Sequence, residues 1–159
     1  MLAGAEIIDF SPAFKADFRS LNHEWITQYF ELEELDNQIL DDPENTILAP
    51  GGHIFMARYQ QETVGTCALI KVSETVWELG KMAVTAKVRG LKIGQQLGQA
   101  AIRKAADLGA VKLVLYSHRS LIPALHVYRK LGFQEVPCPP NGYKRSDIKM
   151  EMDLTLFPH

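Results

Sequence analysis

The 159-residue chain is poor in cysteine and has no long apolar run. Its two cysteines, Cys67 and Cys138, are too few for a disulfide scaffold, so reduced thiols are expected. No apolar stretch approaches the ~20 residues that a membrane span requires. The N-terminal segment carries acidic residues where a secretory signal needs basic ones. These absences predict a small cytoplasmic protein that does not enter a membrane.

Metal-ligand spacing is also absent. The five histidines and two cysteines do not cluster, so no metal site is expected. The net charge of −2 gives no reason to expect binding to nucleic acid. There is no internal repeat, low-complexity tract or linker, and the length suits one domain. The sequence therefore predicts a single domain over residues 1–159.

Basic residues are missing from one long segment and concentrated in another. Between Ser20 and Ala57 there is no Lys or Arg, and this segment holds eight of the 19 acidic residues. Between Lys81 and Arg119, eight basic residues stand against one acid, for a local net charge of +7. Two solvated faces that attract each other would explain this. Equally, the second half could bind an anion and the first half a cation.

Apolar periodicity predicts helices in the first third of the chain, followed by strands. Ser11-Pro12 is typical of a helix start, and apolar residues at helical spacing follow up to Tyr29. A second, acidic helix is predicted from about Glu31 to Leu40, and residues 41–52 are predicted as loop. Three strands joined by polar turns then predict an antiparallel meander: His53–Tyr59, Val64–Val72 and Val76–Val84.

The second half alternates helices and strands. An amphipathic helix is predicted from Ile93 to a glycine terminator at Gly109, followed by a buried strand at Val111–Tyr116. A short helix is predicted from Pro123 to Leu131. Strict alternation predicts a final strand at Ile148–Leu156. An apolar alternating strand could also pair with a second copy, so a homodimer is an open expectation.

The loop that follows the third strand of the meander has the features of an anion site. Residues 85–95 combine basic side chains with Gly90 and Gly94 just before a helix begins. The first N–H groups of a helix are unpaired and lie at its positive end, so they bind phosphate well. The spacing fits neither a Walker A loop nor the dinucleotide fingerprint. A basic loop in which glycines only relieve strain remains the alternative.

Two motifs in order resolve this choice. The first places Arg89, Lys92 and Gly94 after a strand, and the second is A-x-x-x-Y-x-K-L-G-F from Ala124 to Phe133. With a helix and a buried strand between them, they resemble the GNAT superfamily of acyl-CoA N-acyltransferases, most strongly from Val76 to Val136. The resemblance implies an α+β fold whose mixed, mostly antiparallel sheet has splayed central strands and flanking helices.

The resemblance also implies acetyl-CoA as co-substrate and a set of residues that bind it. Main-chain groups of Met82, Ala83 and Val84 would pair with the pantetheine arm and the acyl carbonyl. The backbone N–H groups of seven consecutive residues would hold the pyrophosphate: Arg89, Gly90, Leu91, Lys92, Ile93, Gly94 and Gln95. Three residues in and just before the short helix would complete the cofactor site: Leu121, Ala124 and Tyr128.

Two of these positions depart from the family pattern. Lys92 replaces a glycine, so the loop must avoid a left-handed conformation there or accept ~1 kcal/mol of strain. Lys92 could instead add a cationic phosphate contact. Leu121 stands where many relatives have asparagine. Position 121 can therefore contact the pantetheine only through its backbone or through apolar atoms, and Ser120 is the alternative source of a polar group.

Amine acetylation needs a base and benefits from an acid. An aliphatic amine has a pKa of ~10.4, so a base must remove a proton at neutral pH. Glu78 is the candidate, expected on the same strand face as Met82 and Val84. The alternative is an exposed glutamate paired with Lys71 or Lys81. The resemblance implies that Tyr128 is the general acid, while a core tyrosine is the structural alternative. His118 and His126 are weaker base candidates.

The sequence therefore predicts an N-acetyltransferase that moves an acetyl group from acetyl-CoA to a primary amine of a small molecule or peptide, by direct attack in a ternary complex. The alternative is an acyl-CoA-binding sensor or interaction module without transfer activity. The resemblance implies that the two N-terminal helices wall the acceptor site, and these helices lie in the segment without Lys or Arg. The acceptor is therefore predicted to be cationic, attracted by substrate-binding residues Glu31, Glu33 and Glu34.

Overall fold

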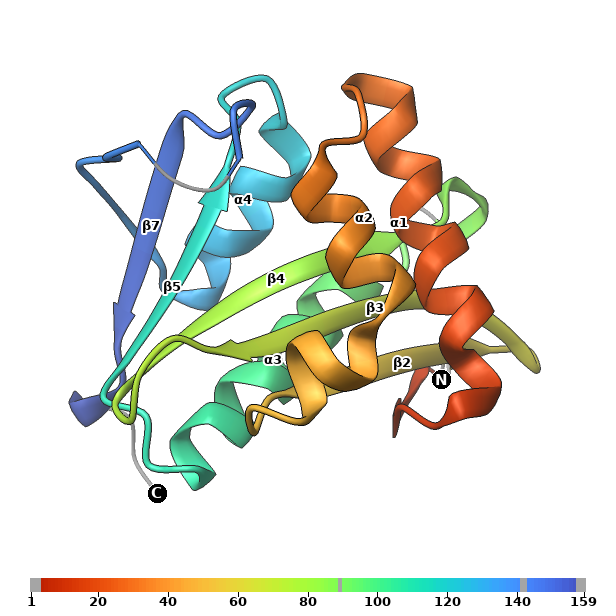
Figure 1. Ribbon diagram of the computed structural model, residues 1–159, viewed down its shortest axis with the longest axis horizontal. Coiled ribbons are helices and arrows are strands. Elements are labelled where there is room, and N and C mark those ends of the chain that lie inside the picture. The colour runs from red at the N-terminus through yellow and green to blue at the C-terminus, as the bar shows by residue number, and fades with distance from the viewer. Residues whose placement is uncertain (1–3, 89, 141–142, 157–159) are drawn as a thin grey trace.

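The computed structural model describes residues 4–88, 90–140 and 143–156. Seven strands form one sheet in the order β1-β2-β3-β4-β5-β7-β6, with helices on its two faces (Figure 1). The longer helices are α1 (Lys15–Tyr29), α2 (Glu34–Asp41), α3 (Ile93–Asp107) and α4 (Ile122–Leu131). The strands are β1 (Glu6–Asp9), β2 (His53–Tyr59), β3 (Glu62–Lys71), β4 (Val76–Val84), β5 (Lys112–Ser117), β6 (Gln134–Val136) and β7 (Ile148–Asp153).

Two central strands separate along their length. β4 and β5 are parallel, and every other neighbouring pair in the sheet is antiparallel. The two pair only where Val76–Glu78 meets Lys112–Val114, although β4 continues to Val84 and β5 to Ser117. Figure 1 shows them diverging beyond this point. The predicted fold class, with its splayed central strands, is confirmed.

Each face of the sheet has its own apolar core. On one face, α3 and α4 bury residues such as Leu97 and Leu125 against the inward residues of β3, β4 and β5. On the other, α1 and α2 bury Phe18 and Leu40 against β2 and β3. Burial of a large apolar side chain contributes about 2 kcal/mol, so both faces hold the sheet. We call the region where β4 and β5 no longer pair the gap between these strands.

Sequence patterns located most elements and missed the shortest. The meander is confirmed, with β2 and β4 at the predicted bounds. β1 and β6 were not predicted, because four and three residues are too few for a visible period. The predicted loop at 41–52 contains a π-helix at Glu44–Leu48. Ser11 precedes a short 3-10 helix, Pro12–Phe14, before α1 begins.

The last strand is shorter than predicted. β7 ends at Asp153, and Leu154–Leu156 is a 3-10 helix. The Asp153 carboxylate accepts hydrogen bonds from the Thr155 backbone N–H (2.9 Å) and hydroxyl (2.6 Å), which turns the chain away from the sheet. β7 also lies between β5 and β6, so it has no free edge with which to pair with a second copy.

A β-bulge interrupts β4 next to the gap. Thr66 pairs with Ala83 and Ala68 pairs with Gly80, so Lys81 and Met82 together stand opposite Cys67. Lys81 has a φ of 51°, in the left-handed region. The extra residue reverses the inward and outward alternation of the strand beyond it.

Among the described residues, no helix is both long and apolar enough to cross the hydrocarbon part of a membrane.

Candidate active site

The start of α3 presents unpaired backbone N–H groups at the end of β4. The chain leaves β4 at Val84, forms a short 3-10 helix at Ala86–Val88, and enters α3 at Ile93. The first intrahelical bond at this end is donated by the N–H of Gln96 to the carbonyl of Lys92, at 3.1 Å. Among the described residues, no side chain caps the helix start, so the N–H groups of Ile93, Gly94 and Gln95 are available for an anion. Arg89, predicted here, lies outside the described residues.

Lys92 takes the conformation that a glycine would take most easily. Its φ of 60° and ψ of 29° are left-handed, and Gly90, two residues earlier, has a φ of 84°. The predicted alternative of negative φ at Lys92 is therefore wrong, and the strain is accepted. The Lys92 and Leu91 side chains are exposed beside the helix start, which keeps the lysine charge near the N–H groups.

Tyr128 projects from α4 into the core on the α3 face. Its ring packs edge-to-face on Phe133, with 6.2 Å between ring centroids. Its hydroxyl has no hydrogen-bond partner among the described residues. Burial raises the pKa of Tyr128 to about 12, with a smaller contribution from the nearby Cys67 thiol. The phenol therefore keeps its proton throughout the neutral range and can donate it.

Glu78 lies on β4, on the sheet face that α1 and α2 cover. Its cross-strand partner Ile70 packs into the core of that face, whereas Met82 and Val84 pack on the α3 face. The expectation that Glu78 shares a face with Met82 and Val84 is wrong, because the bulge at Lys81 and Met82 changes the alternation. Burial raises the pKa of Glu78 to about 7, although the charge of Lys81 opposes the rise.

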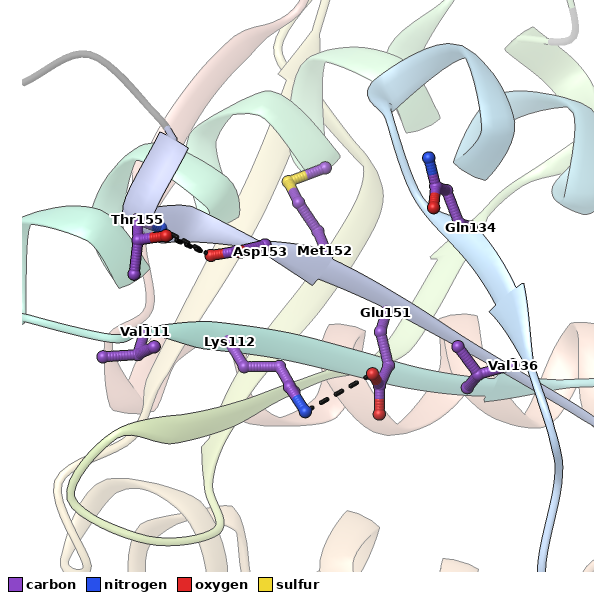
Figure 2. Close-up of a pocket in the computed structure, with 8 residues that line it drawn as sticks. All are labelled: Val111, Lys112, Gln134, Val136, Glu151, Met152, Asp153 and Thr155. Carbon is purple, nitrogen blue, oxygen red and sulfur yellow. Dashed lines mark hydrogen bonds and ion pairs between the residues drawn. The ribbon is translucent and has the colours of Figure 1, made fainter.

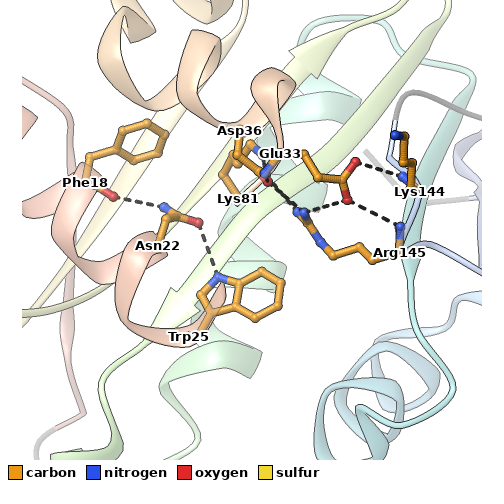
Figure 3. Close-up of polar contacts among 8 residues, drawn as sticks. All are labelled: Phe18, Asn22, Trp25, Glu33, Asp36, Lys81, Lys144 and Arg145. Carbon is orange, nitrogen blue, oxygen red and sulfur yellow. Dashed lines mark hydrogen bonds and ion pairs between the residues drawn. The ribbon is translucent and has the colours of Figure 1, made fainter. Parts of the chain in front are cut away.

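A cluster of charges lies between α2, β4 and the segment before β7: Asp36, Glu33, Lys81 and Arg145, which we call the buried charge cluster (Figure 3). The Lys81 ammonium donates to Asp36 Oδ1 at 2.9 Å. Arg145 donates to both carboxylate oxygens of Asp36, at 2.7 and 2.8 Å. Burial alone would raise the pKa of Asp36, but the bonds from Arg145 and the charge of Lys81 lower it to about 2. Asp36 is thus fixed as an anion.

The three acids predicted to bind substrate occupy different surroundings. Glu33 caps the start of α2 and accepts bonds from the backbone N–H of Lys144 at 2.8 Å and from Arg145 Nη1 at 3.2 Å. Glu31 and Glu34 are exposed. The charge of Glu33 is therefore already matched within the protein, and Glu31 and Glu34 remain open to solvent.

Aromatic rings lie near the two cations of the cluster. The Arg145 guanidinium lies 4.7 Å from the Tyr143 ring centroid, 5.8 Å from Trp25 and 6.0 Å from Phe30. The Lys81 ammonium lies 4.5 Å from the Tyr143 centroid. Such cation–π contacts stabilise a partly desolvated cation by about 1 kcal/mol. The sequence analysis did not bring Asp36, Lys81 and Arg145 together; a lysine in the mostly apolar strand β4 was the one available signal.

The end of β5 carries a second, smaller polar group. His118 Nδ1 lies 2.7 Å from the Ser120 hydroxyl and its ring packs on Phe30, with 5.2 Å between centroids. Because the Ser120 hydroxyl is engaged by His118, it is not a free substitute for a polar residue at position 121. Leu121 itself precedes α4, with its side chain partly exposed.

Two surface hollows lie away from both Tyr128 and Glu78. The first, about 340 Å³, lies between the start of β5, the strand β6 and the end of β7, and contains an ion pair between Lys112 and Glu151 (Figure 2). The second, about 410 Å³, lies between the β2–β3 turn and the loop before α3, and Lys87, Val88 and Leu91 line one side of it. No group of three or more metal-ligating side chains occurs among the described residues.

Comparison with known proteins decides the family. The family model described as the acetyltransferase (GNAT) family matches residues 16–133. The chain belongs to the GNAT acetyltransferase family. The predicted family is confirmed, and with it the predicted enzyme class, an acetyl-CoA-dependent N-acetyltransferase.

Individual relatives agree with this assignment. An uncharacterised N-acetyltransferase of Schizosaccharomyces pombe is 26% identical over 143 residues, covering 83% of this chain and 87% of its own. A GNAT acetyltransferase structure from Staphylococcus aureus has a TM-score of 0.86 at 23% identity, covering 95% of this chain and 99% of its own. An acetyltransferase from Salmonella typhimurium, solved with acetyl-CoA, has a TM-score of 0.75 at 15% identity, covering 96% and 95%.

Proposed function

We propose that this GNAT acetyltransferase moves an acetyl group from acetyl-CoA to a primary amine of a small molecule or peptide, by direct attack in a ternary complex. One observation carries the proposal: Glu78, with a pKa near 7, is the last residue of β4 that pairs with β5 before the two strands separate. Tyr128, which keeps its proton, packs in the core on the other face of the sheet. A base poised near the working pH and a protonated acid are what amine acetylation uses.

The donor would enter the gap with its pyrophosphate at the start of α3. The N–H groups of Ile93, Gly94 and Gln95 would hold the phosphates, and Lys92 adds positive charge. Main-chain groups of Met82, Ala83 and Val84 have no strand partner on the β5 side, so they are free to pair with the pantetheine. Arg89, Gly90, Leu91, Leu121 and Ala124 complete the proposed set. The Salmonella typhimurium neighbour, which holds acetyl-CoA, supports this donor.

The bonds change in one addition and one elimination. Glu78 first takes a proton from the bound ammonium group. The neutral amine nitrogen then attacks the thioester carbonyl carbon and forms the C–N bond, and the second proton of that nitrogen passes to solvent water. The C–S bond then breaks, and Tyr128 gives its proton to the departing sulfur. Since a thiol of this kind has a pKa of about 8.5, the acid matters less than the base near neutral pH.

The acceptor would approach Glu78 from the α1 and α2 side. We infer that the acceptor is a cationic amine, attracted mainly by the exposed carboxylates of Glu31 and Glu34. Glu33 contributes less, because its carboxylate is already bonded to Arg145. That residues 1–159 form one catalytic domain, that the protein is cytoplasmic, and that it forms a homodimer remain predictions from the sequence.

An acceptor screen tests the proposal. The protein is mixed with acetyl-CoA and a panel of cationic, neutral and anionic amines, and free thiol and acetylated product are measured by absorbance and mass. We expect thiol release above the rate without amine, matched by product, and fastest for a cationic amine. Tight binding of acetyl-CoA with no amine-dependent release would instead support the rival function, an acyl-CoA-binding module.

A further inference from the structure

The sheet pairing of β4 with β5 ends at Glu78 and Val114, and the gap begins there. Lys81 on β4 and Ser117 on β5 each lie three residues beyond this last pair. Three residues of extended strand cover about 10 Å, and the bulge makes the path along β4 somewhat shorter. Lys81 and Ser117 therefore stand at comparable depths on the two sides of the gap, where sheet hydrogen bonds no longer set the distance between the strands.

On the β4 side of the gap, Lys81 is bonded to α2. Its ammonium group donates to Asp36 Oδ1 at 2.9 Å. The two side chains are 4% and 0% exposed, so water and salt weaken this ion pair far less than they weaken a surface pair. Asp36 is therefore held over β4 at the depth of Lys81.

On the β5 side, the segment before β7 is attached to the end of the strand. The backbone N–H of Asp147 donates to the carbonyl of Ser117 at 3.0 Å, and Ile148 pairs with Ser117 in the sheet. The carboxylate of Asp147 also accepts a bond from the backbone N–H of Arg119 at 2.9 Å. Arg145, two residues before Asp147, is thus carried by a segment that is fixed to β5.

Arg145 joins the two sides. Its guanidinium group donates to both carboxylate oxygens of Asp36, at 2.7 and 2.8 Å, in the paired geometry that gives strong and directional contacts. Glu33, at the start of α2, accepts further bonds from the guanidinium at 3.2 Å and from the backbone N–H of Arg145 at 3.3 Å. Asp36 therefore receives hydrogen bonds from both sides of the gap, from Lys81 on β4 and from Arg145 beside β5.

The charges within the cluster balance, with two cations against two carboxylates that are largely buried. Burying such a network costs desolvation free energy, and apolar residues of similar volume often stabilise a fold as well. What apolar residues do not supply is a set of bonds with defined length and direction. The ring of His118 also packs on Phe30, which adds contact between α1 and the end of β5 without paired hydrogen bonds.

We propose that Arg145 is a positioning residue for acetyl transfer: through Asp36 it ties the end of β5 to Lys81 on β4, and it holds the gap at the width that the pantetheine arm of acetyl-CoA needs. This deepens the proposed function and rests on its placement of the donor between β4 and β5. A gap of fixed width is preorganised for the donor. If the strand ends moved apart part of the time, the apparent donor affinity would fall with the fraction of molecules whose gap has the right width.

The test is calorimetric titration of Arg145→Met with two ligands: acetyl-CoA, and 3′-phospho-ADP, which is the nucleotide part of the donor without the pantetheine. Methionine keeps an unbranched apolar side chain near the rings of Trp25 and Phe30 but removes the bonds to Asp36. We expect the affinity for acetyl-CoA to fall about threefold or more, as for a gap that is competent in about a third of the molecules. The affinity for 3′-phospho-ADP, which the start of α3 would hold, should stay unchanged.

Two further variants serve as controls. Arg19 pairs with Asp41 at 2.7 Å and joins α1 to α2 rather than β4 to β5, so Arg19→Met should bind both ligands like the wild type. Arg145→Lys keeps the positive charge but loses the paired geometry, and it should show a smaller loss of acetyl-CoA affinity. If Arg145→Met does not fold, Arg145→Lys takes its place and is judged in the same way.

The possible results separate this inference from the function on which it rests. Unchanged acetyl-CoA affinity in the folded Arg145 variant overturns the positioning role. An equal loss for both ligands also overturns it, because a general weakening of the fold would disturb the start of α3 as much as the gap. If the wild type binds acetyl-CoA no more tightly than 3′-phospho-ADP, the pantetheine does not use the gap. In that case the proposed placement of the donor fails first, and the role of Arg145 fails with it.

Discussion

At the scale of single residues, burial sets the proton state of both proposed catalytic groups. Glu78 is a carboxyl with its pKa raised to about 7, and Tyr128 is a phenol with its pKa raised to about 12. Desolvation disfavours the charged form in each case. The same physical effect therefore yields a base that is half ionised at neutral pH and an acid that is fully protonated there.

Replacing Tyr128 by phenylalanine tests the acid. Because Tyr128→Phe keeps the ring packing on Phe133 and removes only the hydroxyl, we expect kcat to fall by about 10²-fold. Calorimetric affinity for acetyl-CoA should stay within a few-fold of wild type. Full turnover in the variant would make Tyr128 a packing residue, and water would then protonate the thiolate.

At the scale of elements, two helices position the proposed site: the start of α3 offers N–H groups to the donor, and α2 is held to β4 by the bond between Asp36 and Lys81. Sequence periodicity located both helices, because fifteen and eight residues with an apolar face give a readable pattern. The loop before α3 was predicted as an anion site from its glycines and basic residues together with the resemblance to the GNAT superfamily, and that site stays a prediction. The position of Glu78 was not predictable in the same way, because one extra residue at Lys81 changes which face a side chain occupies.

A glutamate at Gly94 should weaken donor binding. A Cβ at this position would meet only Met82 Sδ at 3.9 Å and Val84 Cγ2 at 4.0 Å, so the variant has room to fold. Its carboxylate would repel the pyrophosphate, and we expect Gly94→Glu to lower acetyl-CoA affinity at least about tenfold by calorimetry. Gly94→Ala adds volume without charge and serves as control. Equal acetyl-CoA affinities in the glutamate variant and the wild type would show that the pyrophosphate does not bind at the start of α3.

Asp36 should make the stability of the protein depend on acid pH. Its pKa is about 2 in the fold, while an unfolded aspartate has a pKa near 3.9, so the unfolded state binds the proton first as pH falls. The resulting stability is present above about pH 4 and is lost towards about pH 2, by about 2 kcal/mol. We expect Asp36→Asn to lack this dependence in urea unfolding measured across that range.

The control for Asp36 is an exposed acid of the same helix. Asp41 pairs with Arg19 at 2.7 Å, and its side chain is 55% exposed. An exposed pair contributes little, so Asp41→Asn should keep the acid dependence of the wild type. An Asp36→Asn variant whose unfolding free energy falls with pH as steeply as that of the wild type would contradict the account.

At the scale of the whole molecule, the acidic and the basic segment of the chain meet in the fold. The sequence analysis saw the imbalance but could not decide between internal pairing and ligand binding. The structure shows internal pairing: Asp36 binds Lys81 of the basic segment, and Glu33 and Asp36 bind Arg145, more than a hundred positions away, while Glu31 and Glu34 stay exposed. Pairing between such distant residues leaves no local pattern, which is why the buried charge cluster was missed.

Capture of a cationic acceptor should depend on salt. We expect kcat/KM for the preferred amine to fall as ionic strength rises, and the double variant Glu31→Lys/Glu34→Lys to lower it at low salt while acetyl-CoA affinity is nearly unchanged. These two positions avoid Glu33, whose reversal would break its bonds to Arg145. Turnover that is indifferent to both salt and charge reversal would show that the acids only solvate the helix.

The account rests on proton transfer to Glu78 across the gap between β4 and β5. Its most direct test is the pH dependence of kcat/KM for wild type and Glu78→Gln with the best amine from the screen. The wild type should lose activity below a midpoint near pH 7, matching the pKa of Glu78, and the variant should be slower throughout and lack that midpoint. An identical acidic limb in both proteins, at equal rates, would contradict the assignment.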